Sequence, residues 1–128
     1  MFIQIDFGNA MPIYSQIVVQ VKYLIATGAI QEGELIPSVR ELAKTLTINP
    51  LTVSRAYRLL QEDHLLEARR GLGLAVVAGA AEKCRDERVA IFESRLKQIF
   101  NEAIQSRLDI QEIRMIVERC LKEAIRKA

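Results

Sequence analysis

The sequence predicts a mainly α-helical chain with one small β-hairpin. Three observations support this fold class. Two short amphipathic segments, each with a helix-start signal, follow one another closely between residues 38 and 60. Two short apolar runs then flank a glycine-containing tip near Gly71, which predicts a hairpin. From residue 82 to the end, apolar residues recur at helical spacing, which predicts long helices.

The composition is that of a small protein with an aliphatic interior. Half of the 128 residues are hydrophobic, but aromatic residues make up only 5% and Trp is absent. The length fits one domain, or one small domain with an appendage. No run approaches the ~20 apolar residues of a membrane span, and the N-terminus lacks the pattern of a secretion signal. We therefore expect a soluble cytoplasmic protein with reduced thiols and no membrane partner.

The residues that commonly hold metals or perform catalysis are scarce. His64 is the single histidine, and Cys84 and Cys120 are far apart in the sequence. A zinc site needs about four ligands in close array, so we expect no metal and no cofactor. The chain also lacks a nucleophile motif and a phosphate-binding glycine loop, which argues against an enzyme. Cys120 falls on an apolar stripe and is expected in the core, whereas exposure of Cys84 would allow a redox-sensor role as a minor alternative.

The N-terminal segment predicts an extended piece followed by a helix. Residues 2–6 alternate apolar and polar side chains, as a short strand or an extended arm does. A helix is expected to begin after Met11 and Pro12 and to end at Gly28, because glycine accepts the left-handed conformation found at helix C-termini. Its expected inward stripe consists of Ile13, Ile17, Gln20, Val21, Leu24 and Ile25.

Two helices with strong start signals occupy residues 38–60. Ser38 and Glu41 have the spacing of a capping box at the first helix, and Asn49 with Pro50 suits the start of the second. The short gap between them is the mark of a helix-turn-helix. The expected inward residues are Val39, Leu42, Ala43 and Leu46 in the first helix and Val53, Ala56, Tyr57 and Leu60 in the second. The outward face of the second helix carries Leu51, Thr52, Ser54, Arg55 and Arg58, a mixture that suits the edge of a DNA groove.

A basic hairpin is expected after the second of these helices. Residues 65–69 and 74–77 read as strands around a tip at residues 70–73, where glycine permits the turn. A helix-turn-helix followed by such a hairpin is a winged helix, which we expect to span residues 1–79. Arg69 and Arg70 bring positive charge to the tip, and their clustering with the arginines of the helices favours contact with DNA over a purely solubilising role.

Residues 80–128 are expected to form a two-helix dimerisation region behind a hinge at residues 78–81. The first helix has a heptad seam of Val89, Phe92, Leu96, Ile99 and Ala103, widened by Phe100 and Ile104. Asp109 and Glu112 have capping-box spacing at the start of the last helix. That helix is expected to bury Ile113, Ile116, Val117, Cys120, Leu121 and Ala124. Two helices cannot cover this much apolar surface by themselves, so a second copy of the chain is the expected cover.

Four segments resemble, in the same order and with the same gaps, parts of the GntR family of bacterial transcriptional regulators. They are PIYSQI at residues 12–17, IPSVRELA at 36–43, NPLTVSRAY at 49–57 and RRGLG at 69–73. The C-terminal part is too short for the large effector domains of that family. It resembles instead the small YtrA-like branch, whose tail serves mainly for dimerisation.

The resemblance implies a DNA-contacting role for particular positions. Ser38 and Arg40 would contact phosphate, with Arg40 also able to reach a base. The positions expected to face the major groove are Asn49, Pro50, Thr52, Ser54 and Arg55, and those expected at the minor groove are Arg70 and Gly71. Many family members have arginine at the positions of Pro50 and Ser54, which leaves Arg55 as the main cationic reader of bases. Leu72 replaces a polar wing residue and weakens the case for deep insertion of the wing.

These observations predict a homodimeric transcriptional regulator that binds double-stranded DNA in a sequence-specific manner. We expect a repressor that acts on an operator with two-fold symmetry. Arg58 and Arg69 are also expected to contact DNA. The alternative is a winged helix that binds a protein partner through its basic face, without sequence-specific DNA binding. A two-helix tail offers little room for a usual ligand pocket of ~300 Å³, so any small-molecule effector would bind at the dimer interface or near the hinge.

Overall fold

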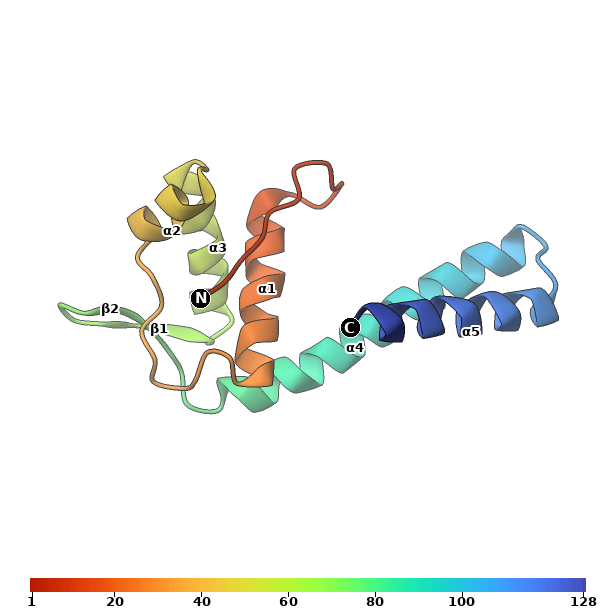
Figure 1. Ribbon diagram of the computed structural model, residues 1–128. Helices are drawn as coiled ribbons and strands as arrows, with labels where there is room; N and C mark the ends of the chain where they lie inside the picture. Colours follow the sequence, from red (N-terminus) through yellow and green to blue (C-terminus); the bar gives the residue numbers. More distant parts are fainter. The chain divides into compact units, whose positions relative to one another are not determined.

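The computed structural model describes all 128 residues and contains five helices and one two-stranded sheet (Figure 1). The elements in chain order are α1 (Ile13–Thr27), α2 (Val39–Leu46), α3 (Pro50–Glu62), β1 (Leu66–Arg69), β2 (Gly73–Val76), α4 (Ala80–Gln105) and α5 (Ile110–Lys127). The chain divides into two compact units, Met1–Val89 and Ala90–Ala128. The predicted fold class, mainly helical with a small hairpin after a helix-turn-helix and two helices at the C-terminus, is confirmed.

The N-terminal residues form an extended arm rather than a strand, and the arm is held to α1 by two glutamines. The Gln16 side chain, which is buried, accepts a hydrogen bond from the backbone N–H of Asp6 and donates to the carbonyls of Asp6 and Met11, each at 2.9 Å. Gln20 exchanges a similar pair of hydrogen bonds with the backbone of Gln4. Helix α1 ends at Gly28 in the left-handed conformation, as predicted.

The helix-turn-helix has the predicted caps. Both hydrogen bonds of the Ser38–Glu41 capping box are present, and the Asn49 side chain accepts a hydrogen bond from the backbone N–H of Leu51. Between the helices, Thr47 adopts a left-handed conformation with φ 55°, which is unusual for a β-branched residue. The Tyr57 hydroxyl donates to the Pro37 carbonyl at 2.8 Å and so fixes α3 against the segment before α2.

The wing is the antiparallel pair of β1 and β2, with Leu66 opposite Val76 and Arg69 opposite Gly73. Gly73 therefore belongs to the second strand, one residue earlier than the sequence indicated. The segment before α2 lies along the free edge of β2, because the Ile36 N–H donates to the Leu74 carbonyl at 2.9 Å. The base of the wing is thus part of the domain, while its tip extends from it (Figure 1).

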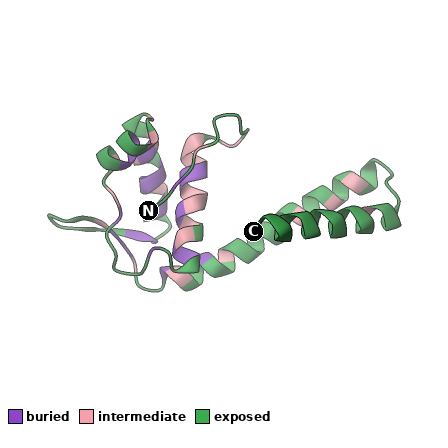
Figure 2. Cartoon of the chain, viewed as in Figure 1, coloured by how far each residue is buried: buried purple, intermediate pink, exposed green.

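The hydrophobic core lies among the three helices of the helix-turn-helix unit and the base of the wing (Figure 2). Its fully buried aliphatic side chains include Ile17, Ile25, Val53 and Leu60. All four predicted inward residues of α3 are buried. In α1, Ile17, Val21 and Ile25 are buried as predicted, whereas the other three predicted residues are half-buried. In α2, Leu42 and Ala43 are buried and the other two predicted residues are half-buried.

The start of α4 is part of this core, so the predicted hinge at residues 78–81 is wrong. Helix α4 begins at Ala80, and both Ala80 and Cys84 are buried among the residues of the first unit. The small side chain of Ala80 packs in the core, whereas Ala78 and Gly79 before it are exposed. The possible exposure of Cys84 is also contradicted, because its side chain is 1% exposed. Burial, together with the nearby Glu87 carboxylate, raises the pKa of its thiol, which opposes reactivity.

Polar contacts from distant residues fasten the first turns of α4. The Glu32 carboxylate accepts hydrogen bonds from the backbone N–H groups of Gly79 at 2.9 Å and Ala81 at 3.3 Å, and therefore caps the helix. The Lys22 ammonium group of α1 forms ion pairs with Glu87 at 2.7 Å and with Asp63 at 3.1 Å. These contacts join α1, the end of α3 and α4 within one unit.

The second unit consists of α4 from Ala90 onward and of the whole of α5. A turn with Arg107 in the left-handed conformation connects the helices. Asp109 begins α5 at the predicted place, but its side chain makes no capping hydrogen bond, so the second capping box does not form. No residue of α5 is buried, and Cys120 is exposed (Figure 2). The expected burial of the α5 stripe and of Cys120 is therefore absent in the single chain, because one helix hairpin cannot enclose both apolar faces.

Candidate nucleic-acid interface

The outward face of α3 is open to solvent and mixed in character. Arg55 and Arg58 are exposed, Thr52 and Ser54 are half-buried, and Leu51 is 74% exposed. Val53, Ala56, Tyr57 and Leu60 anchor the opposite face of the helix in the core. Because that face is fixed, the helix presents its polar side chains as a rigid surface.

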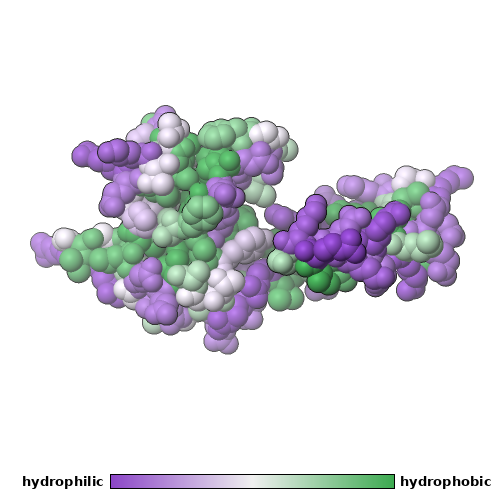
Figure 3. Space-filling view, in the orientation of Figure 1, coloured by the Kyte–Doolittle hydropathy of each residue, from purple (hydrophilic) through white to green (hydrophobic).

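The remaining residues predicted to contact DNA are also exposed. Ser38 and Arg40 lie at the start of α2, Asn49 and Pro50 at the start of α3, and Arg69, Arg70 and Gly71 at the wing tip. Ser38 and Asn49 use a side-chain oxygen to cap their helices. The hydroxyl hydrogen of Ser38 and the amide hydrogens of Asn49 are left to donate. In the space-filling view, hydrophilic side chains gather over α2 and at the outer end of the wing (Figure 3).

The arginines of this surface carry uncompensated charge. The ion pairs of the chain join Lys22 to Asp63 and Glu87, and Lys97 to Glu93, and none involves an arginine. The unpaired arginines of the surface are Arg40, Arg55, Arg58, Arg69 and Arg70. Exposed guanidinium groups without carboxylate partners on α2, α3 and the wing favour an anionic partner such as the phosphate backbone of DNA.

One contact in the surface did not emerge from the sequence. The guanidinium carbon of Arg55 lies 3.7 Å from the centroid of the Tyr14 ring, which belongs to the first turn of α1. This distance is that of a cation–π stack. Helix α2 lies between the two residues in the sequence, so no local pattern indicates the pairing. The one signal available was the occurrence of Tyr14 within the family-like segment at residues 12–17.

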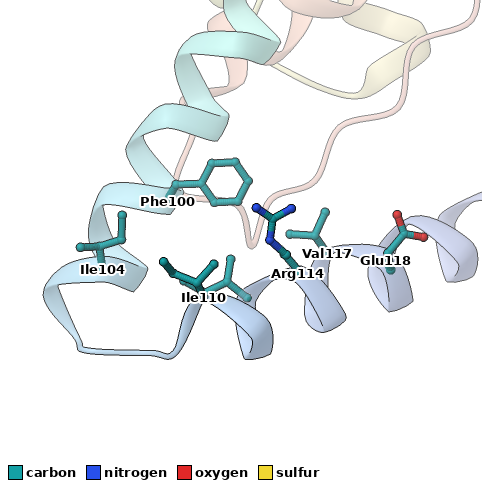
Figure 4. A pocket seen from close by; sticks show the side chains of 7 residues that line it. Phe100, Ile104, Ile110, Arg114, Val117 and Glu118 are labelled. Carbon is teal, nitrogen blue, oxygen red and sulfur yellow. The ribbon is translucent and has the colours of Figure 1, made fainter.

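The apolar residues expected at a dimer interface are accessible in the single chain. The exposed ones are Val89, Phe92, Ile99, Ile116, Val117 and Cys120, and the half-buried ones are Leu96, Phe100, Ala103 and Ile113. A groove of about 630 Å³ lies between α4 and α5 near their turn. Figure 4 shows Phe100, Arg114 and Val117 directed into it from the two helices. The tail thus has more open volume than expected.

None of the helices combines the length and the apolar character that crossing a bilayer requires. No group of three or more His, Cys, Asp or Glu side chains is arranged to hold a metal ion.

Comparison with known proteins places the chain in a family. Residues 13–76 match the model of bacterial regulatory proteins of the gntR family. The chain is 34% identical over 111 residues to the HTH-type transcriptional repressor YtrA of Bacillus subtilis, an alignment that covers 87% of this chain and 85% of the relative. It is also 32% identical over 97 residues to the uncharacterized regulator YhcF of the same organism, covering 73% and 80% of the two chains.

A solved structure shows the same relationship. The chain resembles a GntR family transcriptional regulator from Listeria monocytogenes with a TM-score of 0.72 and 30% identity, covering 88% of this chain and 98% of the other. Residues 13–76, which match the family model, contain the helix-turn-helix and the wing described above. The chain therefore belongs to the gntR family of bacterial regulatory proteins, and it is a DNA-binding transcriptional regulator rather than an enzyme.

Proposed function

We propose that this regulator acts as a homodimeric repressor on an operator with two-fold symmetry. The observation that carries the proposal is the outward face of α3, where exposed arginines without carboxylate partners lie beside small hydroxyl side chains. Such a face offers donors to phosphate oxygens and to base edges in the major groove. The name of YtrA, which is a repressor, supports the sign of regulation.

Within this proposal the DNA-binding residues have distinct roles. Ser38 and Arg40 donate to phosphate at the start of α2. The side chains in the major groove are those of Asn49, Pro50, Thr52, Ser54 and Arg55, with Arg58 toward the groove edge. Arg69, Arg70 and Gly71 bring the wing tip to the minor groove. Arg55 is the main reader of bases, because a guanidinium group can donate two hydrogen bonds to guanine O6 and N7.

The same proposal assigns DNA binding and dimerisation to different parts of the chain. The first unit, Met1–Val89, binds DNA, and the second unit, Ala90–Ala128, joins two copies; the start of α4, which the sequence assigned to the dimerisation region, packs in the first unit. The exposed apolar side chains of α4 and α5, with the groove between them, are the surface that a second copy covers. The α3 helices of the two copies then reach successive major grooves of a symmetric site. A dimer formed through this surface would also have closed symmetry, as most homo-oligomers do.

The DNA-binding part is tested with two arginine variants. A duplex enriched by the wild-type protein from a random pool serves as the operator, and a scrambled duplex of the same composition serves as its control. We expect Arg55→Ala to reduce the preference for the enriched duplex. We expect Arg40→Ala to weaken binding to both and to lower the slope of log K against log salt by about 1. Arg126→Ala, in the last turn of α5, is the matched control and should match the wild type.

The outcomes separate the roles. An unchanged preference in Arg55→Ala would refute its base-reading role. An unchanged salt slope in Arg40→Ala would refute its phosphate contact. Failure of the wild-type protein to retard any duplex at low salt would refute the whole proposal and favour a winged helix that binds a protein partner.

The dimer is tested by introducing charge at the seam. Phe92 and Ile99 are 63% and 57% exposed, so glutamate at both positions leaves the fold of the single chain intact. We expect sedimentation velocity to show a dimer for the wild type and a monomer for the double variant, because a carboxylate buried at an interface is strongly unfavourable. Ser94→Glu, on the polar face of the same helix, should remain dimeric. A monomeric wild type would refute this part of the proposal.

A further inference from the structure

We propose that Tyr14 is a positioning residue that holds the Arg55 side chain in the orientation required for DNA recognition. The inference rests on the proposed role of Arg55 as a DNA-contacting residue. The two side chains come from different helices, α1 and α3, and the guanidinium carbon lies 3.7 Å from the ring centroid. Arg55 is otherwise exposed and has no carboxylate partner, so the ring is the group that restrains it.

The ring itself is well anchored. Tyr14 is half-buried and packs against the core cluster of the first unit. It lies two residues before Gln16, whose buried amide makes three hydrogen bonds to the backbone of the segment that precedes α1. These bonds fix the start of α1, and α1 packs directly on α3. A stacking partner on a fixed helix restricts the many rotamers that a free arginine side chain would sample.

The stacked geometry leaves the guanidinium group able to act. An aromatic face contacts the flat side of the guanidinium plane, whereas its N–H groups lie within that plane and point outward. Stacking on Tyr14 therefore leaves the N–H groups of Arg55 free to donate hydrogen bonds. The in-plane donors fit a pair of acceptors, either O6 and N7 of guanine or two phosphate oxygens. Restraint of the side chain before binding lowers the entropy lost when those bonds form.

The proposal predicts which property of Tyr14 matters. Tyr14 contacts Arg55 through the face of its ring, and its hydroxyl group takes no part in that stack. Phenylalanine should therefore replace it without loss, and leucine should not, although leucine retains an apolar side chain against the core. Lysine at position 55 should not substitute for arginine, because an ammonium group lacks the planar pair of donors.

A double-mutant cycle tests the coupling. The variants are Tyr14→Leu, Arg55→Ala and their combination, with dissociation constants measured for the enriched and scrambled duplexes. We expect Tyr14→Leu to weaken binding to the enriched duplex roughly two- to fivefold, the range of an exposed cation–π contact. In the Arg55→Ala background, Tyr14→Leu should cause no further loss. Tyr14→Phe should bind as the wild type does, and Tyr23→Leu, an exposed tyrosine of the same helix, is the matched control.

A spectroscopic measurement reads the stack in the absence of DNA. The ring current of Tyr14 should shift the Arg55 side-chain protons to low frequency in the wild type and in Tyr14→Phe. The shift should disappear in Tyr14→Leu, while the backbone amide spectrum of α3 stays that of a folded protein. Absence of the shift from the wild-type spectrum would overturn the proposal.

The binding outcomes distinguish this inference from the proposed function. A loss in Tyr14→Leu that depends on Arg55 supports it, whether the loss is confined to the enriched duplex, as for a base contact, or extends to both, as for phosphate. Equal losses with and without Arg55 would overturn it and leave the function intact. An Arg55→Ala variant that binds both duplexes like the wild type would refute the DNA role of Arg55, and the inference with it.

Discussion

Replacing Lys22 with methionine tests whether the ion-pair cluster holds the start of α4 to the DNA-binding unit. The Lys22 side chain is 14% exposed, and its ammonium group lies 2.7 Å from a carboxylate oxygen of Glu87 and 3.1 Å from one of Asp63. Methionine retains the apolar stem of the lysine and leaves no large cavity. The substitution therefore removes mainly the charge, and it leaves two carboxylates facing a site without a cation.

The expected cost follows from the burial of the three groups. Exposed ion pairs contribute about 0–1 kcal/mol, and removing one partner of a fully buried pair costs about 3–5 kcal/mol. This cluster is intermediate, because Lys22 is nearly buried while the side chains of Asp63 and Glu87 are 51% and 35% exposed. We expect a loss of about 2 kcal/mol. For a domain of this size, that corresponds to a decrease in Tm of roughly 10 °C.

Thermal unfolding followed by circular dichroism measures the effect at a fixed protein concentration, since association with a second copy would otherwise change Tm. The matched control is Lys97→Met. Lys97 pairs with Glu93 at 3.5 Å with both side chains well exposed, so its removal should cost only about 0.3–0.5 kcal/mol. The difference between the Lys22 variant and the wild type should shrink at about 1 M salt, where charges are screened. Equal effects of the two substitutions would refute the reasoning.

Three other predictions concern the same unit. Glu32→Ala removes the cap of α4 and should lower the free energy of unfolding by about 1 kcal/mol, measured by urea denaturation. Tyr57→Phe removes the hydrogen bond to the Pro37 carbonyl and should cost about 1 kcal/mol in the same assay. The protein should also lose stability above pH 9, because its folded state holds three protons more tightly than its unfolded state. Scans of Tm from neutral to alkaline pH would show this.

The sign of the pH effect follows from three raised pKa values. Burial raises the pKa of Cys84 above its ordinary 9.0 and that of Tyr57 above its ordinary 10.0. Burial acts to lower the pKa of Lys22, but its hydrogen bonds to Glu87 and Asp63 outweigh this and raise it above 10.5. A raised folded-state pKa adds stability below the unfolded-state value and loses it as pH rises through the folded-state value. Cys84→Ala should remove the earliest part of the loss.

Each of these results has a contradicting outcome. Glu32→Ala with unchanged urea stability would mean that the backbone N–H groups of α4 find water as readily as the carboxylate. Tyr57→Phe without loss would mean that the Pro37 carbonyl is solvated in the variant. A Tm that stays constant through pH 11 would contradict the raised pKa values of all three groups.

The helix-turn-helix could be predicted well from the sequence because its signals are local. Ser38 and Glu41 are three residues apart, and Asn49 caps a backbone group two residues away. The aliphatic stripes of α1 and α3 depend on helical spacing alone. The glycine at the wing tip correctly indicated the turn, but the second strand begins at Gly73, one residue earlier than the sequence predicted. These features are set by neighbouring residues, whatever the rest of the chain does.

The contacts that organise the surface and the start of α4 could not be predicted, because they join residues distant in sequence. Lys22 and Glu87 are separated by 65 positions, and Glu32 and Gly79 by 47. A run of alanine and glycine is typical both of a linker and of a close packing contact, and at Ala80 the second applies. Asp109 shows the converse, since it has the spacing of a capping residue but makes no capping bond.

Thr47, in the turn between α2 and α3, has a consequence for engineering. A β-branched residue with φ 55° is strained in a conformation that glycine adopts freely, and glycine there would lose more chain entropy on folding. Such strain costs about 1–3 kcal/mol and the entropy of glycine roughly 0.5–1 kcal/mol, so we expect Thr47→Gly to raise Tm without altering any side chain of the α3 surface. The turn between α2 and α3 is then a site at which thermal stability can be changed without changing the DNA sequence that the protein prefers.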